Sequence, residues 1–129
     1  MAVIGADDRI LVSNTTIYPY SAVVKVYVDF TDDGVPDIVG SGAMIGANDV
    51  LTAAHLLWDP IDGFADSIMV VPGQAGSAWP FGSAFGQTWT VPSEYISVGG
   101  GNSDAAFQYD LGVINLSTNI GNSTGWFGL

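Results

Sequence analysis

The sequence predicts an all-β domain folded as a single antiparallel barrel. Its 129 residues are a one-domain length that can bury a core of moderate size. Apolar residues make up 48% of the chain, charged residues only 12%, and the 17 glycines provide for many turns. Short apolar runs separated by turn residues complete the pattern, which is typical of a small barrel and not of a disordered chain.

The first predicted strands are Ile10–Val12 and Ala22–Phe30. In the second, valines alternate with residues such as Lys25 and Tyr27, and both faces of the strand are largely apolar. Such two-sided apolarity suits the wall of a barrel.

The acidic stretch that follows has two interpretations. Asp29, Asp33 and Asp37 occupy positions of an EF-hand-like calcium loop. The match is partial, because the twelfth position is Gly40 where a bidentate glutamate is needed, and strands flank the loop instead of helices. An ordinary hairpin with Asp-Asp-Gly turn chemistry is the favoured interpretation, and calcium at the three aspartates is the alternative.

An apolar hairpin then ends on the only histidine of the chain. Its predicted strands are Ser41–Ile45 and Val50–Ala53, joined by the turn residues Gly46–Asp49. We expect the second strand to end at His55. A lone histidine in an apolar stretch is by default a hydrogen-bonded structural residue, but in a protein that works near neutral pH it is the natural proton carrier.

The remaining elements are shorter or more widely spaced. A single helical turn is expected just after the histidine, and a long loop precedes the strands near the C-terminus. The predicted ranges are Leu56–Trp58 for the turn, Pro72–Phe85 for the loop, and Ile68–Val71, Thr88–Val91 and Tyr109–Leu116 for the strands. Asp110 places a single carboxylate at the start of the last strand.

Two of these segments resemble the catalytic segments of trypsin-like serine proteases. The hairpin followed by Leu51-Thr52-Ala53-Ala54-His55 is similar to the segment that carries the catalytic histidine of that family. The stretch from Asp110 to Leu116 is similar to the segment of the catalytic aspartate, and it follows in the family's order of His, Asp, Ser. The resemblance implies the six-stranded N-terminal barrel of the chymotrypsin-like fold, with His55 transferring protons and Asp110 holding the imidazole in its tautomer.

The resemblance extends over nearly the whole chain. The start at Val3-Ile4-Gly5 and the end at Ile120–Leu129 look like the glutamyl-endopeptidase (V8-like) branch, and the similarity is weakest from Asp59 to Phe107. It implies a secreted hydrolase acting on peptides or proteins, with Met1-Ala2 in the place of an export segment. Cleavage specificity stays open, because the specificity pocket of the family lies in its second barrel.

The resemblance also implies a missing half. The serine of the family lies in a Gly-Asn-Ser-Gly-Gly-like loop of the second barrel, together with the oxyanion donors, and no such loop occurs in residues 1–129. We therefore expect 1–129 to be a truncated N-terminal barrel domain that is inactive alone. Its bare face would meet the missing C-terminal barrel or another copy of itself. The alternative is a non-catalytic protease-fold module for binding or assembly.

Composition excludes several other classes of function. Thirteen acidic residues against two basic ones give a net charge of −11, which argues against nucleic-acid binding. The chain has no cysteine and one histidine, which argues against a transition-metal site. No apolar run approaches the roughly 20 residues that a membrane-spanning helix needs. No cofactor is expected apart from the possible calcium.

Overall fold

The structure, a computed structural model, describes residues 16–31, 33–100 and 109–128. The predicted strand at Ile10–Val12 and the protease-like start at Val3 lie outside these residues.

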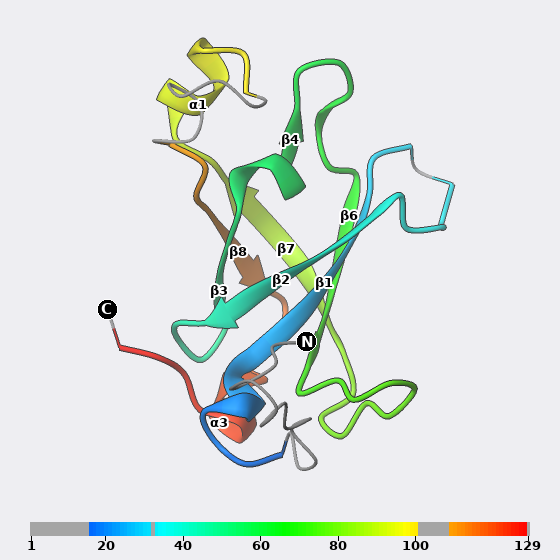
Figure 1. Ribbon diagram of the computed structural model, residues 1–129, viewed down its shortest axis with the longest axis vertical. Coiled ribbons are helices and arrows are strands. Elements are labelled where there is room, and N and C mark those ends of the chain that lie inside the picture. Colours follow the sequence, from blue (N-terminus) through cyan, green and yellow to red (C-terminus); the bar gives the residue numbers. More distant parts are fainter. Residues whose placement is uncertain (1–15, 32, 101–108, 129) are drawn as a thin grey trace, which may run out of the picture.

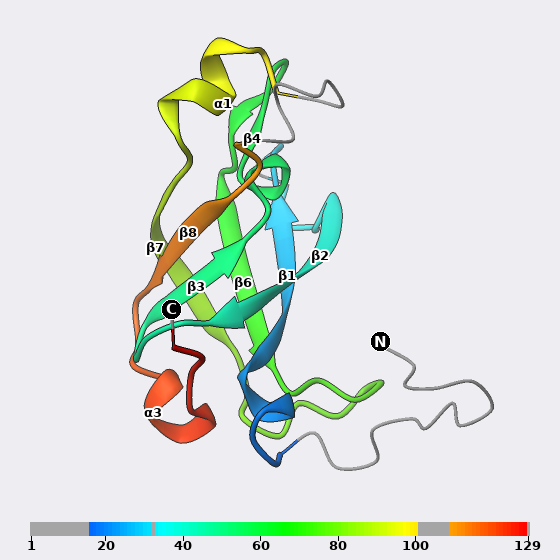
Figure 2. The same cartoon turned by 60° about the vertical axis from the view of Figure 1, so that its left-hand side comes forward.

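Within the described residues, six antiparallel strands close into one barrel, which confirms the predicted fold class (Figures 1 and 2). The order around the barrel is β1–β2–β3–β8–β7–β6. In chain order the barrel strands are β1 (Val23–Asp29), β2 (Ile38–Met44), β3 (Asp49–Thr52), β6 (Ser67–Pro72), β7 (Ala84–Thr90) and β8 (Gly112–Leu116).

Strand β1 shows how the sequence pattern builds the barrel wall. Its side chains alternate, so that Val24, Val26 and Val28 are buried while Lys25 is exposed. β1 lies between β2 and β6, and its inward valines meet the inward residues of both neighbours. Removing each such side chain from water contributes on the order of 1.5–3 kcal/mol before the entropy of ordering is subtracted.

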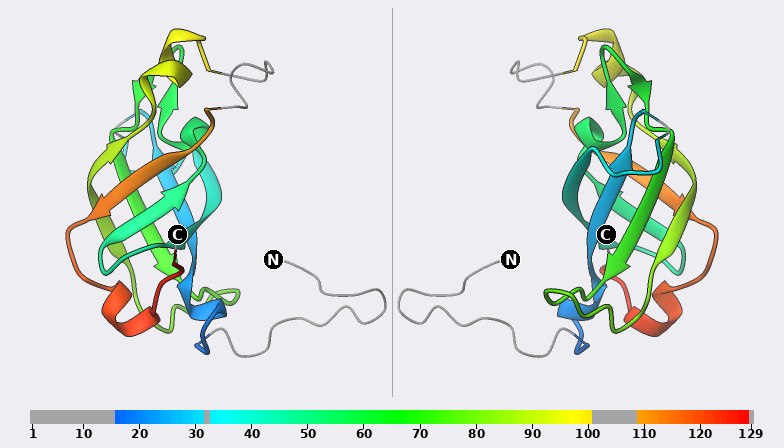
Figure 3. Two further views of the ribbon diagram at one scale, coloured as in Figure 1. Left: turned by 90° about the vertical axis from the view of Figure 1, so that its left-hand side faces the viewer. Right: turned by 90° about the vertical axis from the view of Figure 1, so that its right-hand side faces the viewer.

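Small elements close the two ends of the barrel (Figures 1 and 3). One end carries the η2 turn, a short hairpin and helix α1, and the other carries the η1 turn and helix α3. Their bounds are η1 (Tyr20–Ala22), η2 (Ala54–Leu56), β4 (Trp58–Asp59), β5 (Gly63–Phe64), α1 (Ser93–Ser97) and α3 (Gly121–Thr124). None of the helices in the described parts of the chain has the length and apolarity to cross a bilayer.

The chain leaves the barrel wall earlier than the sequence predicted. β3 ends at Thr52, so His55 lies in the 3₁₀ turn η2 and not at a strand end. The N–H groups of Leu56 and Leu57 donate to the carbonyls of Ala53 and Ala54, at 3.1 and 2.9 Å. Because both leucines are buried, the chain turns inward here, and the expected helical turn at Leu56–Trp58 is shifted by two residues.

The segments before β1 and after β8 are tied together at the end of the barrel near α3. Ser21 Oγ donates to the Thr124 carbonyl oxygen at 2.7 Å in a buried contact. The Phe127 N–H donates to the carbonyl of Met44 in β2 at 2.8 Å, and the ring of Tyr18 lies 5.8 Å from that of Phe127. These contacts join the two outer segments to the wall and to each other.

One glycine in β8 is required by close packing. A Cβ atom at Gly112 would lie 2.5 Å from Leu57 Cδ1 and 2.9 Å from the carbonyl oxygen of Thr90 in the neighbouring strand. We expect Gly112→Ala to lower the free energy of unfolding by about 1–3 kcal/mol in urea denaturation, because backbone cannot move aside as a side chain can. Gly128→Ala is the control, since nothing lies within 4 Å of its Cβ position. Equal stability of the two variants would contradict this account.

Candidate active site

The pairing of β3 with β8 brings His55 and Asp110 together. The last paired residues of the two strands are Thr52 and Gly112. In an antiparallel pair the outgoing end of one strand lies beside the incoming end of the other. The histidine follows β3 and the aspartate precedes β8, so two residues 55 positions apart in the sequence become neighbours.

Asp110 holds His55 at two points. Its Oδ1 accepts the backbone N–H of His55 at 2.9 Å, and its Oδ2 lies 2.9 Å from the ring Nδ1. An ionised carboxylate can only accept, so Nδ1 carries the proton and the Nε2 of the neutral ring keeps its lone pair. The aspartate therefore fixes both the tautomer and the position of the imidazole.

The pair is accessible on the histidine side. The His55 side chain is 56% exposed, whereas that of Asp110 is 15% exposed. With Nδ1 occupied by the carboxylate, the ring has its Nε2 edge for accepting a proton and returning it to a leaving group. This is the arrangement that general acid–base catalysis requires.

Buried neighbours hold the histidine segment in place. Thr52 Oγ1 donates to the Ser41 carbonyl of β2 at 2.8 Å, and Thr52 itself is buried. Ala54 and Leu56, on either side of the histidine, are also buried. The imidazole thus projects from a turn that buried neighbours hold in place.

Asp110 lies just outside the strand in which the sequence placed it. β8 begins at Gly112 and not at Tyr109, because the ladder with β3 ends there. The Leu111 N–H donates to the Tyr109 carbonyl at 2.8 Å, which forms a tight bend around the aspartate. The bend, and not the strand, carries the carboxylate.

The three aspartates of the acidic hairpin also lie close together. Carboxylate oxygens of Asp29, Asp33 and Asp37 are all within 4.8 Å of one another. Asp29 already accepts backbone N–H bonds from Thr31 and Gly34, at 2.9 Å each. These bonds are those of a hairpin turn and need no metal ion to explain them. The twelfth position of the calcium-loop pattern, Gly40, lies within β2. The donor set suits calcium chemically, so a calcium site stays a prediction from the partial motif.

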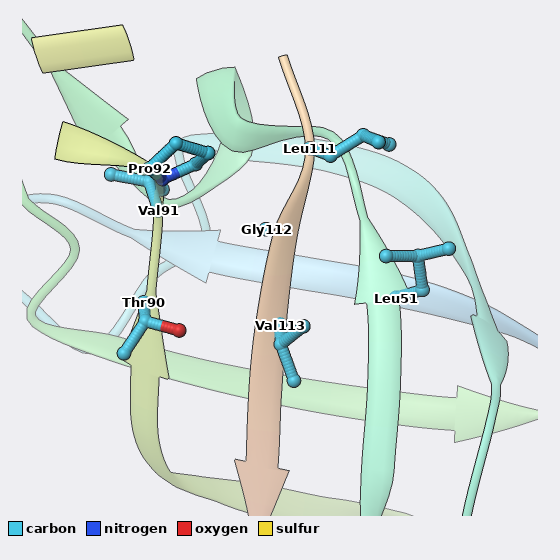
Figure 4. A pocket seen from close by; sticks show the side chains of 7 residues that line it. All are labelled: Leu51, Thr90, Val91, Pro92, Leu111, Gly112 and Val113. Carbon is cyan, nitrogen blue, oxygen red and sulfur yellow. The ribbon is translucent and has the colours of Figure 1, made fainter. Parts of the chain in front are cut away.

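An open apolar groove includes Leu111, the residue that follows Asp110 (Figure 4). It has a volume of about 360 Å³ and lies on the outer wall of β3, β8 and β7. Its lining residues are Leu51, Thr90, Val91, Pro92, Leu111, Gly112 and Val113. Leu111, which directly follows the aspartate, is 56% exposed. The site therefore borders an uncovered apolar surface.

Residues behind the pair were not identified from the sequence. Trp58 and Tyr95 form an edge-to-face ring pair with centroids 6.0 Å apart, and Ala54 packs with them. No periodic signal marks this contact, because the short strand β4 and the short helix α1 carry one ring each.

Replacement of the aspartate by asparagine should reverse the tautomer of His55. The backbone N–H of His55 can only donate, so the amide oxygen of Asp110→Asn should face it and the amide NH₂ should face Nδ1. The ring proton should then move to Nε2, as it does when the triad aspartate of a serine protease is replaced by asparagine. In ¹⁵N NMR at alkaline pH, the single imidazole should show protonated Nδ1 in the wild type and protonated Nε2 in this variant.

Asp110→Ala is the matched control for that measurement. It removes the amide donor as well, so the exposed ring should exchange between both tautomers and show ¹⁵N shifts averaged over them, unlike the single tautomer expected in the wild type and in Asp110→Asn. An unchanged Nδ1 signal in both variants would refute the bonding described above.

Comparison with known proteins gives relatives over nearly the whole chain. Glutamyl endopeptidase of Bacillus licheniformis is 41% identical over 130 residues, covering 98% of this chain and 36% of that protein. Extracellular metalloprotease of Bacillus subtilis is 32% identical over 128 residues, covering 98% of this chain and 38% of that protein. No family model matches the chain.

A solved structure matches the barrel itself. A Glu endopeptidase in complex with MPD superposes with a TM-score of 0.72 at 32% identity, covering 89% of this chain and 48% of that one. The chain thus spans between about a third and a half of the length of these relatives. Over nearly all of its length the chain is similar to part of glutamyl endopeptidase, and its barrel matches part of a solved Glu endopeptidase structure.

Proposed function

We propose that this chain supplies the histidine and the aspartate of the Ser-His-Asp triad of a secreted endopeptidase. The observation that carries the proposal is the two-point contact of Asp110 with the backbone N–H and the Nδ1 of His55. That contact fixes the tautomer with a basic Nε2, which is the state needed to activate a hydroxyl nucleophile. The extracellular relative supports secretion.

In the proposed reaction, His55 Nε2 takes the proton of a serine hydroxyl while the serine oxygen attacks the peptide carbonyl. The imidazolium then gives the proton to the leaving amine, which breaks the peptide bond and leaves an acyl-enzyme. A water molecule next loses a proton to Nε2 and attacks the ester, which releases the acid and restores the serine. Asp110 stays ionised throughout and stabilises the imidazolium.

The serine and the oxyanion donors would come from outside these 129 residues. The coverage of the relatives is consistent with this, since each extends well beyond the matched segment. We assign residues 1–129 to an N-terminal barrel domain that is inactive by itself. Without donors aimed at the developing oxyanion, most of the transition-state stabilisation is missing.

The groove beside Leu111 is the surface that we assign to the nucleophile-bearing barrel. It is continuous with the bend that carries Asp110, so a domain seated there would also reach His55. Contacts between domains of one chain bury about 600–1,500 Å². Self-association through the same apolar surface is the competing outcome, which light scattering of the 129-residue chain would reveal.

One relative is named a metalloprotease, so a metal mechanism needs a separate test. A catalytic zinc site takes three protein ligands plus a water, and histidine is the commonest of those ligands. This chain has one histidine and no cysteine, and the Nδ1 of that histidine is engaged by Asp110. A serine mechanism is therefore the one that we propose for the His55–Asp110 pair.

Peptidase activity should depend on the pair and on the longer chain. We expect the longest natural product of the gene to cleave peptides, and His55→Ala or Asp110→Ala to lower kcat/KM by about 10⁴-fold or more. The 129-residue chain should be inactive on the same panel of peptides, which offer cleavable bonds after Glu, Lys or Phe. Asp66→Ala is the control, because it removes an exposed acid that is not part of the pair.

Inhibitors separate the two mechanisms in that assay. A serine-directed organophosphorus reagent should abolish the activity, whereas a zinc chelator should leave it unchanged. Loss with the chelator alone would replace the serine mechanism by a metal one. If the longer protein is inactive as well, the chain is instead a protease-fold module for binding or assembly.

A further inference from the structure

A small apolar cluster, separate from the barrel core, lies behind the His–Asp pair. Ala54 and Tyr95 are its buried members, and Trp58, Val91 and Tyr109 pack against them. We refer to these five residues as the Tyr95 cluster.

The Tyr95 cluster is attached to both halves of the pair. Ala54 directly precedes His55, and Tyr109 directly precedes Asp110. Trp58 follows the histidine by three residues, at the start of β4. Both backbone segments that carry the pair thus converge on one packing unit.

Tyr95 is the central side chain of that unit. It is 1% exposed, and among the described residues it is the largest side chain that is fully buried. Its N–H donates to the Pro92 carbonyl at 3.0 Å, and its own carbonyl accepts the N–H of Gly100 at 3.0 Å. The ring of Trp58 meets it at 82°, in an edge-to-face contact.

The packing around the ring leaves little room. A Cβ atom at Gly100 would lie 3.1 Å from the Trp58 ring and 3.2 Å from the Tyr95 ring. Gly100 also has a φ of +61°, a conformation that favours glycine. Close packing here limits how far the Tyr95 ring can shift towards Gly100.

We propose that Tyr95 is a positioning residue whose ring sets the distance between the His55 turn and the Asp110 bend. The ladder between β3 and β8 ends at Thr52 and Gly112, before either residue of the pair is reached. Beyond that point, Ala54 and Tyr95 form one buried unit, and Tyr109 packs against that unit from the aspartate side of the pair. Displacement of a catalytic group by about 1 Å can cost about 100-fold in rate, so such packing matters for catalysis.

The inference rests on the proposed function only where it invokes catalysis. The geometry itself is measurable on the 129-residue chain, because its single histidine gives one imidazole signal. A proton held between Nδ1 and a carboxylate gives a downfield N–H resonance that is protected from exchange with water. That resonance reports the distance between the pair and does not depend on peptidase activity.

Tyr95→Ala should abolish the downfield resonance, or speed its exchange with water by about tenfold or more, while circular dichroism shows the barrel intact. Tyr95→Phe should retain the resonance, because the ring and its packing are preserved. Leu116→Ala is the matched control, since Leu116 is 1% exposed in the main core at the far end of β8. It should lower the unfolding midpoint and leave the resonance unchanged.

Several outcomes would overturn the inference. Retention of the resonance in folded Tyr95→Ala would show that the ring does not set the distance between His55 and Asp110. Equal loss in Leu116→Ala, at the same folded fraction, would show a general effect of destabilisation, and loss in folded Tyr95→Phe would show that ring packing is not the cause. If Tyr95→Ala does not fold, Tyr95→Leu, which keeps apolar volume without a planar ring, is read by the same criteria.

Kinetics of the longer natural product provide the second readout. There, Tyr95→Ala should lower kcat by about 10–100-fold and leave KM nearly unchanged, since substrate binding is not touched. An inactive wild type would refute the proposed function, while the imidazole resonance would still decide the role of Tyr95.

Discussion

The register between β3 and β8 is the constraint on which the rest of the structure depends. It sets which side chains of the two strands face the core, and it also sets which residues meet where the two strands separate. A slip of one residue would turn inward side chains outward and shift the aspartate by about 3.3 Å relative to the histidine. Core packing and the His–Asp contact therefore stabilise the same alignment, and neither can change alone.

The pair contributes to that alignment in a different way from the core. The histidine ring is more than half exposed, and ion pairs in such surroundings add on the order of 0–1 kcal/mol to stability. Val24, Val26 and Val28 of β1, by contrast, are almost entirely removed from water. A two-point contact with so little effect on stability is better explained by the orientation of the imidazole than by the folding of the barrel.

Much of the wall could be predicted from the sequence, because alternation in β1 and the turn residues of the β2–β3 hairpin are local signals. The partnership of His55 with Asp110 came from motif resemblance, since nothing in periodicity joins residues so far apart. The ends of β3 and β8 could not be predicted, because each depends on where its partner strand departs. The burial of Tyr95 could not be predicted from the sequence either, since it arises from packing between two short elements.

Closure of the barrel has a consequence for how such a domain can be divided from a larger protein. Each of the six barrel strands has a hydrogen-bonded neighbour on both sides, so none is an edge strand, although β2 with β3 and β6 with β7 pair over only part of their length. A fragment cut through an open sheet would expose such an edge and invite strand addition by neighbouring molecules. Here the ring of strands is closed and apolar side chains lie uncovered on its outer wall, so association through the barrel should come mainly from side chains.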